Sequence, residues 1–147
     1  MTIRVRRLEP KDKAAWLPLF KGYIAFYKAA VADDVIELTW TRLLSSDQAA
    51  VLGLAAVDEC DTPVGIAHVV FHSSTWSATH YCYLEDLFVD PESRGQGAGR
   101  RLIEAVYQEA DARTCTRTYW MTQEFNYPAR MLYDQLATKS VFVQYRR

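Results

Sequence analysis

Three of the six glycines in this 147-residue chain lie within five positions, at Gly95, Gly97 and Gly99. They follow an apolar run that ends at Asp90-Pro91, and apolar residues at helical spacing come after them. Glycines in such a turn allow several backbone N–H groups to face one ligand, and the helix that follows adds its unpaired N-terminal donors. The segment therefore predicts a cradle for a phosphate or pyrophosphate group, although a glycine-rich turn can also be purely structural.

Two familiar phosphate-binding motifs do not fit this cradle. A P-loop requires Lys and then Ser or Thr after its last glycine, whereas Arg100 and Arg101 follow Gly99. The dinucleotide fingerprint requires a glycine at position 100 or 102, where Arg100 and Leu102 stand. The phosphate ligand must therefore be recognised by another motif.

Hydrophobic periodicity predicts an α/β (α+β) fold in which helices flank a strand-rich middle. The absence of repeats, linkers and low-complexity segments favours a single domain over residues 1–147. The predicted strands cover residues 1–8, 50–57, 64–71, 81–89, 118–122 and 141–145, and the predicted helices cover residues 10–30, a stretch from 33, 97–112 and 129–136.

The charge and cysteine content exclude several classes of protein. Lys and Arg number 17 against 18 Asp and Glu, so we expect neither nucleic acid nor a membrane surface as a partner. The N-terminal residues lack the apolar run of a signal peptide, and no stretch is long enough to span a membrane. Cys60, Cys82 and Cys115 are odd in number and lack C-x-x-C spacing, which favours a cytoplasmic protein without a disulfide framework or a metal site.

Two segments carry a resemblance to a known family. Arg94, Gly97 and Gly99 form an R-x-x-G-x-G pattern after the predicted strand, which resembles the signature of the GCN5-related N-acetyltransferase (GNAT) superfamily. Downstream, Asn126 to Tyr133 resembles the superfamily's N-x-x-A-x-x-L-Y segment. Within the superfamily, residues 83–87 are similar to polyamine acetyltransferases, whereas residues 137–146 are similar to the subgroup of protein and D-amino-acid acetyltransferases.

The resemblance implies a GNAT-like mixed, largely antiparallel sheet of about six strands flanked by helices. It also implies an enzyme that transfers acetyl from acetyl-CoA (coenzyme A), without a metal, to a primary amine by direct attack on the thioester. The acceptor would be a small amine, an amino acid or a protein lysine. The implied cofactor-binding residues are Leu87, Phe88, Val89, Arg94, Gly95, Gln96, Gly97, Ala98, Gly99, Arg100, Asn126 and Tyr133.

Within that set, the resemblance implies different roles. A backbone N–H between Leu87 and Val89 would stabilise the tetrahedral oxyanion, residues 96–100 would hold the pyrophosphate, and Asn126 would bond the pantetheine arm. Tyr133 would protonate the leaving thiolate, because a tyrosine with a pKa near 10 is a proton donor at physiological pH. A core aromatic is the alternative interpretation of Tyr133.

An alkyl amine has a pKa of about 10.4 by analogy with Lys, so at neutral pH it needs a base before it can attack. Strict alternation along residues 81–89 places Glu85 on one face with Tyr81, Tyr83, Leu87 and Val89. The resemblance places the active site on that face, so Glu85 is the candidate base, acting through a water molecule. The neighbouring carboxylates Asp86 and Glu92 are alternatives.

Several questions stay open at the sequence level. Family members commonly have Gly at the position of Ala137 and two closing strands, whereas this chain has room for one, so we predict a homodimer that completes the substrate wall. Tyr23, Tyr27 and Trp40 could line an amine pocket or belong to the core. A catalytically inactive acyl-CoA-binding or sensor module and a nucleotide-binding protein are the rival functions.

Overall fold

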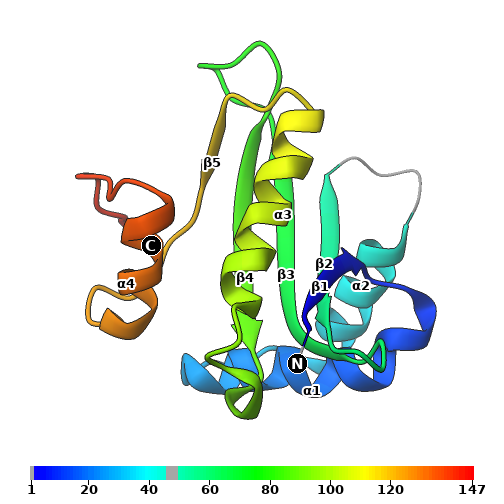
Figure 1. Cartoon of the computed structure of the whole chain (residues 1–147). Helices are drawn as coiled ribbons and strands as arrows, with labels where there is room; N and C mark the ends of the chain where they lie inside the picture. The colour runs from blue at the N-terminus through cyan, green and yellow to red at the C-terminus, as the bar shows by residue number, and fades with distance from the viewer. Residues whose placement is uncertain (1, 46–49) are drawn as a thin grey trace.

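The computed structural model describes residues 2–45 and 50–147. Its sheet has five strands in the order β1–β2–β3–β4–β5 (Figure 1). The first four pair antiparallel, and β5 pairs parallel with β4, so the sheet is mixed and largely antiparallel, as predicted. The strands are β1 (Arg4–Arg7), β2 (Val51–Val57), β3 (Pro63–His72), β4 (Tyr81–Val89) and β5 (Arg117–Tyr119).

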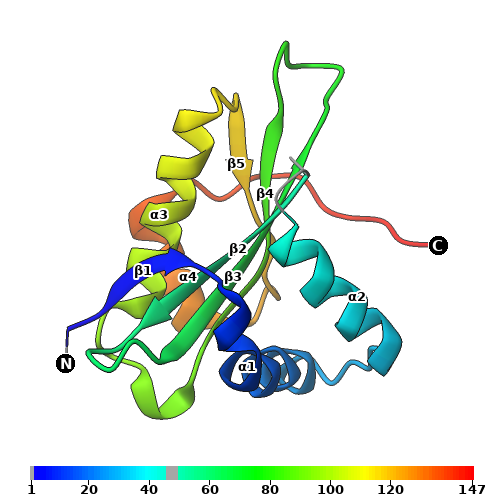
Figure 2. The same cartoon turned by 90° about the vertical axis from the view of Figure 1, so that its right-hand side faces the viewer.

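Helices cover both faces of this sheet. Figure 2 shows α3 (Ala98–Ala112) on one face, with α1 (Lys13–Phe26) and α2 (Asp33–Leu44) on the other. Short 3-10 helices precede α1 (Pro10–Asp12) and follow β4 (Pro91–Ser93), and α4 (Tyr127–Leu136) comes after β5. In the described part of the chain, no helix is both long and apolar enough to cross a membrane.

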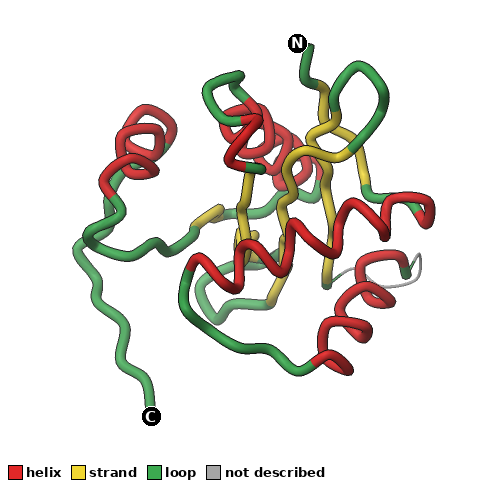
Figure 3. Tube along the Cα trace, turned by 90° about the horizontal axis from the view of Figure 1, so that it is seen from below, coloured by secondary structure: helices red, strands yellow, loops and turns green. Residues whose placement is uncertain are grey.

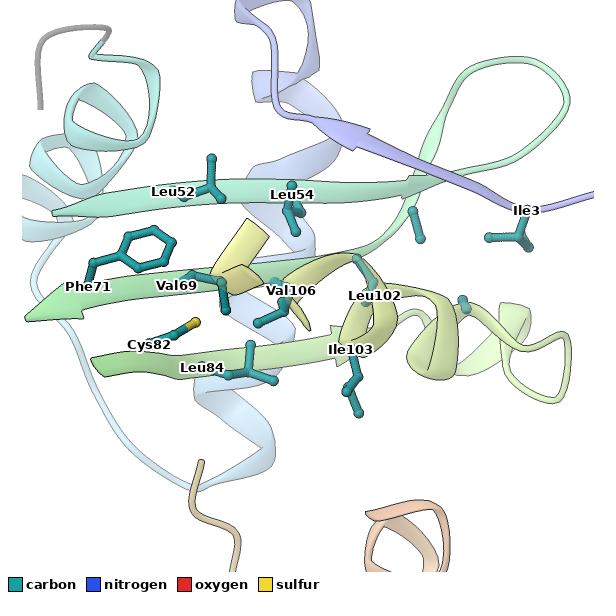
Figure 4. Packing of buried hydrophobic residues seen from close by; sticks show 14 of the residues in the cluster. Ile3, Leu52, Leu54, Val69, Phe71, Cys82, Leu84, Leu102, Ile103 and Val106 are labelled. Carbon is teal, nitrogen blue, oxygen red and sulfur yellow. The ribbon is translucent and has the colours of Figure 1, made fainter. Parts of the chain in front are cut away.

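Each face of the sheet carries its own hydrophobic core. Leu52 and Leu54 point towards α3, whereas Ala55 and Val57 point towards α1 and α2. Because both faces are covered, β2 is apolar throughout instead of alternating with polar residues. The α3 core, shown in Figure 4, includes Ile3, Leu52, Leu54, Val69, Phe71, Cys82, Leu84, Leu102, Ile103 and Val106.

The predicted closing strand over residues 141–145 is wrong. Residues 137–147 have no regular secondary structure, and Val141, Phe142, Val143 and Tyr145 are 78–92% exposed. A strand needs a neighbour for its N–H and C=O groups. Among the described residues the tail has none, and it runs away from the sheet (Figure 3), so these residues form five strands instead of six.

An ion-pair cluster holds β1 to the 3-10 helix that follows it and to the turn between β2 and β3. The Arg6 guanidinium makes two hydrogen bonds to the Asp12 carboxylate, at 2.7 and 3.0 Å, and one to Asp61, at 2.9 Å. Burial raises the pKa of Asp12, but the Arg6 guanidinium and the backbone N–H of Glu9 outweigh it, so the pKa lies below its usual value. The cluster joins the start of α1 to the β2–β3 turn.

Candidate active site

The sheet opens between β4 and β5. The two strands pair only from Tyr81 to Tyr83 and from Arg117 to Tyr119, although β4 continues to Val89. After Tyr119 the chain turns away from β4 towards α4 (Figure 1). A small pocket lies in this opening, lined by Tyr23, Tyr27, Leu84, Glu85, Leu87, Trp120, Met121 and Tyr133.

A bulge at Glu85 changes which side chains face the two cores. His68 pairs with Asp86 and Val69 pairs with Leu84, so Glu85 has no partner on β3. Leu84 belongs to the α3 core, and after the bulge Leu87 packs against that same core. The predicted strict alternation of β4 is therefore wrong. The extra residue shifts the side-chain period by one, so Leu87 and Val89 do not share a face with Tyr83.

The backbone N–H groups of β4 alternate in direction along the opening. The Asp90 N–H donates to the Val64 carbonyl on β3. Because N–H groups alternate in direction along a strand, the N–H of Phe88 also faces β3, whereas those of Leu87 and Val89 face the open edge. Of the three predicted oxyanion donors, the strand geometry therefore favours Leu87 and Val89 over Phe88.

The glycine-rich loop lies at the end of β4 and leads into α3. Gly95 and Gly97 have φ values of +80° and +84°, and among the described residues no atom beyond the adjoining residues lies within 4 Å of the place that a β-carbon would take at either position. Such φ values disfavour residues with a β-carbon, and Gly97 is the N-cap residue of α3. The loop is therefore exposed and leads into a helix N-terminus, a position at which proteins commonly bind phosphate groups.

The other predicted loop residues have distinct surroundings. The Arg94 Nε donates to the Val89 carbonyl at 3.2 Å, and its guanidinium lies over the Phe88 ring. The Arg100 side chain bonds Gln135 of α4, and Ala98 is buried in the α3 core. Gln96 is exposed, and the position of a β-carbon on Gly99 is 3.5 Å from Cδ2 of Leu132.

Tyr133 of α4 and Glu85 of β4 line the same pocket. Burial, with a smaller contribution from Tyr27, raises the pKa of Tyr133 to about 12, so the phenol stays protonated at neutral pH. Burial and the neighbouring Asp86 raise the pKa of Glu85 above its ordinary value, against a smaller opposite effect of the Tyr83 hydroxyl. A protonated donor and a carboxylate with raised proton affinity thus share one pocket.

Asn126 lies just before α4, the helix that brings Tyr133 to the pocket. It is the N-cap residue of α4, and its side-chain amide donates to the Thr122 hydroxyl at 3.1 Å. At the other end of α4, Ala137 leaves the helix in an extended conformation, with φ −153° and ψ 177°, where the family commonly has glycine. The helix therefore ends without the left-handed residue that a glycine C-cap commonly supplies.

For some pocket residues the sequence left the role open, and for others it predicted no role in the pocket. Tyr23 and Tyr27 line the pocket, whereas Trp40 is buried in the core beneath α1 and α2. Trp120 and Met121 follow β5 and complete the pocket wall. No sequence pattern points to them, because the divergence of β5 from β4 is what brings them there. In the described ranges, no group of three His, Cys, Asp or Glu side chains is placed to bind a metal ion.

Known proteins with similar sequences are acetyltransferases. The D-amino-acid N-acetyltransferase HPA3 of Saccharomyces cerevisiae is 35% identical over 145 residues, which cover 99% of this chain and 90% of that protein. A thialysine N-epsilon-acetyltransferase of Bos taurus is 35% identical over 78 residues, 53% of this chain and 45% of that protein.

Solved structures show the same fold. The aminoglycoside N-acetyltransferase AAC(6')-Iy in complex with CoA superposes with a TM-score of 0.84 at 19% identity, covering 99% of this chain and 94% of that one. A ribosomal-protein-alanine N-acetyltransferase from Brucella melitensis biovar Abortus 2308 has a TM-score of 0.81 at 19% identity, with 99% of both chains covered. The sequence profile of the Acetyltransferase (GNAT) family matches residues 16–137. With its glycine cradle beside an open edge of β4, this chain belongs to the acetyltransferase (GNAT) family.

Proposed function

We propose that this chain transfers an acetyl group from acetyl-CoA to a primary amine, by direct attack of the amine nitrogen on the thioester carbonyl. The observation that carries this proposal is that Tyr133 and Glu85 line one pocket beside the open edge of β4. The family membership and the two named relatives, which act on D-amino acids and on thialysine, support an amine acceptor.

The glycine cradle suits the diphosphate of acetyl-CoA. Gly95 and Gly97 leave open space where any other residue would place a β-carbon, and the N-terminus of α3 adds unpaired donors and a positive dipole end. The residues that would hold acetyl-CoA are those predicted from the sequence, from Leu87 through Arg100, together with Asn126 and Tyr133. Acetyl-CoA supplies the activated acetyl group, and every other task falls to the protein.

Each proton transfer and each charge that develops in this reaction has a candidate residue to serve it. Glu85 takes a proton from the ammonium form of the acceptor, directly or through water, and its raised pKa makes it a stronger base than an ordinary glutamate. The Leu87 or Val89 N–H stabilises the developing oxyanion, because both face the open edge. Tyr133 donates its phenolic proton to the leaving sulfur, which its pKa of about 12 permits.

We also propose a domain organisation, an oligomeric state and a cellular compartment for this chain. Residues 1–147 form one acetyltransferase domain, which the two cores on one shared sheet support. A homodimer covers the apolar tail at Val141, Phe142 and Val143, because an exposed apolar segment of extended shape invites pairing. A cytoplasmic setting agrees with the three free cysteines of the described residues. A strictly monomeric mass with full activity would exclude the dimer.

The decisive experiment is an amine panel assayed for release of free CoA thiol. The panel contains D-amino acids, thialysine, lysine-bearing peptides and alkyl diamines, each with acetyl-CoA. We expect thiol release that depends on one class of amine, with the acetylated amine identified by mass spectrometry. Binding of acetyl-CoA without turnover of any amine would instead identify the inactive sensor module. Thermal stabilisation by ATP and not by acetyl-CoA would identify a nucleotide-binding protein.

A further inference from the structure

A buried histidine lies behind the candidate base. His68, in the middle of β3, has a side chain only 4% exposed, enclosed between α1 and β4. The Trp16 indole N–H donates to His68 Nε2 at 2.9 Å, and His68 Nδ1 lies 2.8 Å from Oδ2 of Asp86. Asp86 is the residue next to Glu85 and follows directly on the bulge.

The hydrogen bonds fix the protonation of His68. An indole N–H can only donate, so Nε2 of His68 must accept with its lone pair. The ring proton therefore lies on Nδ1, which donates to the Asp86 carboxylate. His68 is held as the neutral Nδ1–H tautomer, so it fixes the direction of the Asp86 carboxylate without cancelling its charge.

Asp86 is thus a largely buried carboxylate without a cationic partner. Its side chain is 16% exposed, and its neighbours are the neutral His68 and the Tyr23 hydroxyl. Among the described residues, no Lys or Arg forms an ion pair with Asp86 or with Glu85. Two adjacent ionised carboxylates that lack a counter-ion are unfavourable in a half-buried site, and binding of a proton or of a cation relieves this cost.

The surrounding aromatic rings also suit a cation. Tyr23 and Tyr27 of α1 contact each other edge to face, with ring centroids 5.0 Å apart, and both line the pocket that Glu85 shares. The Tyr23 hydroxyl donates to the Glu85 carbonyl at 3.2 Å and so lies against the bulge. Aromatic faces attract an alkylammonium group within about 6 Å of the ring centroid.

We propose that Asp86, aimed by the neutral His68 and through it by Trp16, supplies the fixed negative charge that holds the ammonium form of the acceptor beside Glu85. This inference rests on the proposed function and adds a division of labour between adjacent carboxylates. Asp86 binds the cation, and Glu85 then removes one of its protons. The preferred acceptors are therefore alkyl amines, which arrive as ammonium ions, and not weakly basic aryl amines. Asp86 is a binding residue, and His68 is a positioning residue.

The kinetic test compares Asp86→Asn, Asp86→Glu and wild type with the panel amine of lowest KM. We expect Asp86→Asn to raise the KM of the amine about tenfold or more, with kcat and the KM of acetyl-CoA changed much less. Asp86→Glu keeps the charge and should restore most of the affinity. Asp111→Asn removes a charge from an exposed position of α3 and serves as the matched control.

The positioning role has its own variants. His68→Leu removes the donor to Asp86 and should raise the KM of the amine severalfold, whereas His68→Asn keeps an N–H near the position of Nδ1 and should recover part of the loss. His72→Asn changes the other histidine of β3, which bonds Tyr119, and should leave the KM unchanged. Circular dichroism and thermal melting identify any variant that fails to fold.

Binding without turnover separates this inference from the proposed function. Thermal stabilisation by n-butylammonium, with 1-butanol as the uncharged probe, is measured on wild type and Asp86→Asn without acetyl-CoA. We expect stabilisation of wild type by the ammonium alone, lost in Asp86→Asn. An active wild type whose Asp86→Asn variant keeps both the amine KM and this stabilisation overturns the role of Asp86 and leaves the acetyltransferase function intact. A wild type that acetylates no amine contradicts the function itself, whatever the cation-binding result.

Discussion

The Tyr107 hydroxyl of α3 donates a hydrogen bond to the backbone carbonyl of Leu136, the last residue of α4, at 2.8 Å. This bond, together with the packing of Leu132 against the α3 core, fixes α4 against α3 and so determines where Tyr133 lies. Burial raises the pKa of Tyr107, which keeps the hydroxyl protonated as a donor. One hydrogen bond outside the pocket therefore positions the candidate acid.

Removal of this hydroxyl should loosen α4. We expect Tyr107→Phe to lower the free energy of unfolding by about 0.5–1.5 kcal/mol and kcat severalfold, because Tyr133 is then less well positioned. Urea denaturation and the thiol-release assay measure the two effects. Tyr145→Phe, at a 92% exposed position, is the matched control and should change neither.

The Tyr133 phenol should be needed for turnover and not for binding. We expect Tyr133→Phe to lower kcat by about 10²–10⁴-fold while the affinity for CoA, measured by calorimetry, is nearly kept. The ring of phenylalanine preserves the edge-to-face contact with Trp120. An equal loss of CoA affinity would show that the hydroxyl binds the cosubstrate and is not the acid.

Glu85 should determine the acidic limb of the pH profile of kcat/KM. A base must be ionised, and the raised pKa of Glu85 means that activity falls at a pH above the ordinary range of glutamate. We expect Glu85→Gln to lower kcat/KM and to remove this limb. A limb that persists in the variant would assign the base to another group.

The left-handed conformation of Gly97 makes a paired substitution informative. Valine is disfavoured at φ +84°, by about 1–3 kcal/mol, and would also crowd the cradle, so Gly97→Val should abolish acetyl-CoA binding with a moderate loss of stability. Asparagine tolerates this conformation, and Gly97→Asn should keep the stability and more of the affinity. Intact affinity for acetyl-CoA in a folded Gly97→Val variant would contradict the cradle.

The Arg6–Asp12 pair should make stability depend on pH. Because the pKa of Asp12 is lower in the folded protein, its contribution is present above the unfolded pKa of about 3.9 and is lost as pH falls through the folded value. We expect Asp12→Asn to be less stable than wild type at neutral pH by about 1.5–3 kcal/mol. Urea titrations should show this difference shrink as pH falls below about 4, with Asp111→Asn near wild type throughout.

The sequence predicts most elements because their signals are local. The apolar run of β2 and the spacing of Leu102, Ile103 and Val106 in α3 depend only on neighbours along the chain. The bulge at Glu85 leaves no such signal, since residues 81–89 read equally well as an unbroken strand. It becomes visible only when His68 and Val69 are paired across the sheet.

Some site residues likewise follow from local signals in the sequence, whereas others depend on contacts between distant segments. The turn at Gly95 and Gly97 follows from the conformations that glycine permits, so its shape could be read from the chain alone. The role of His68 could not, because a histidine in an apolar run gives no indication that Trp16, 52 residues earlier, donates to its ring. The tail at 141–145 has the pattern of a strand, but no strand in the described part of the chain pairs with it.

Because β4 contains this extra residue, a substitution and a deletion near Glu85 should have different consequences. On either side of the bulge, Leu84 and Leu87 pack in the same core under α3, whereas Glu85 lines the pocket and Asp86 contacts His68. A substitution at position 85 or 86 can therefore alter which acceptor is used without repacking that core. Deletion of a single residue there would instead turn Leu87 and Val89 out of the core, since a one-residue slip exchanges the faces of a strand. In this part of β4, the amino acid at each position is free to vary with the substrate, whereas the number of residues is not.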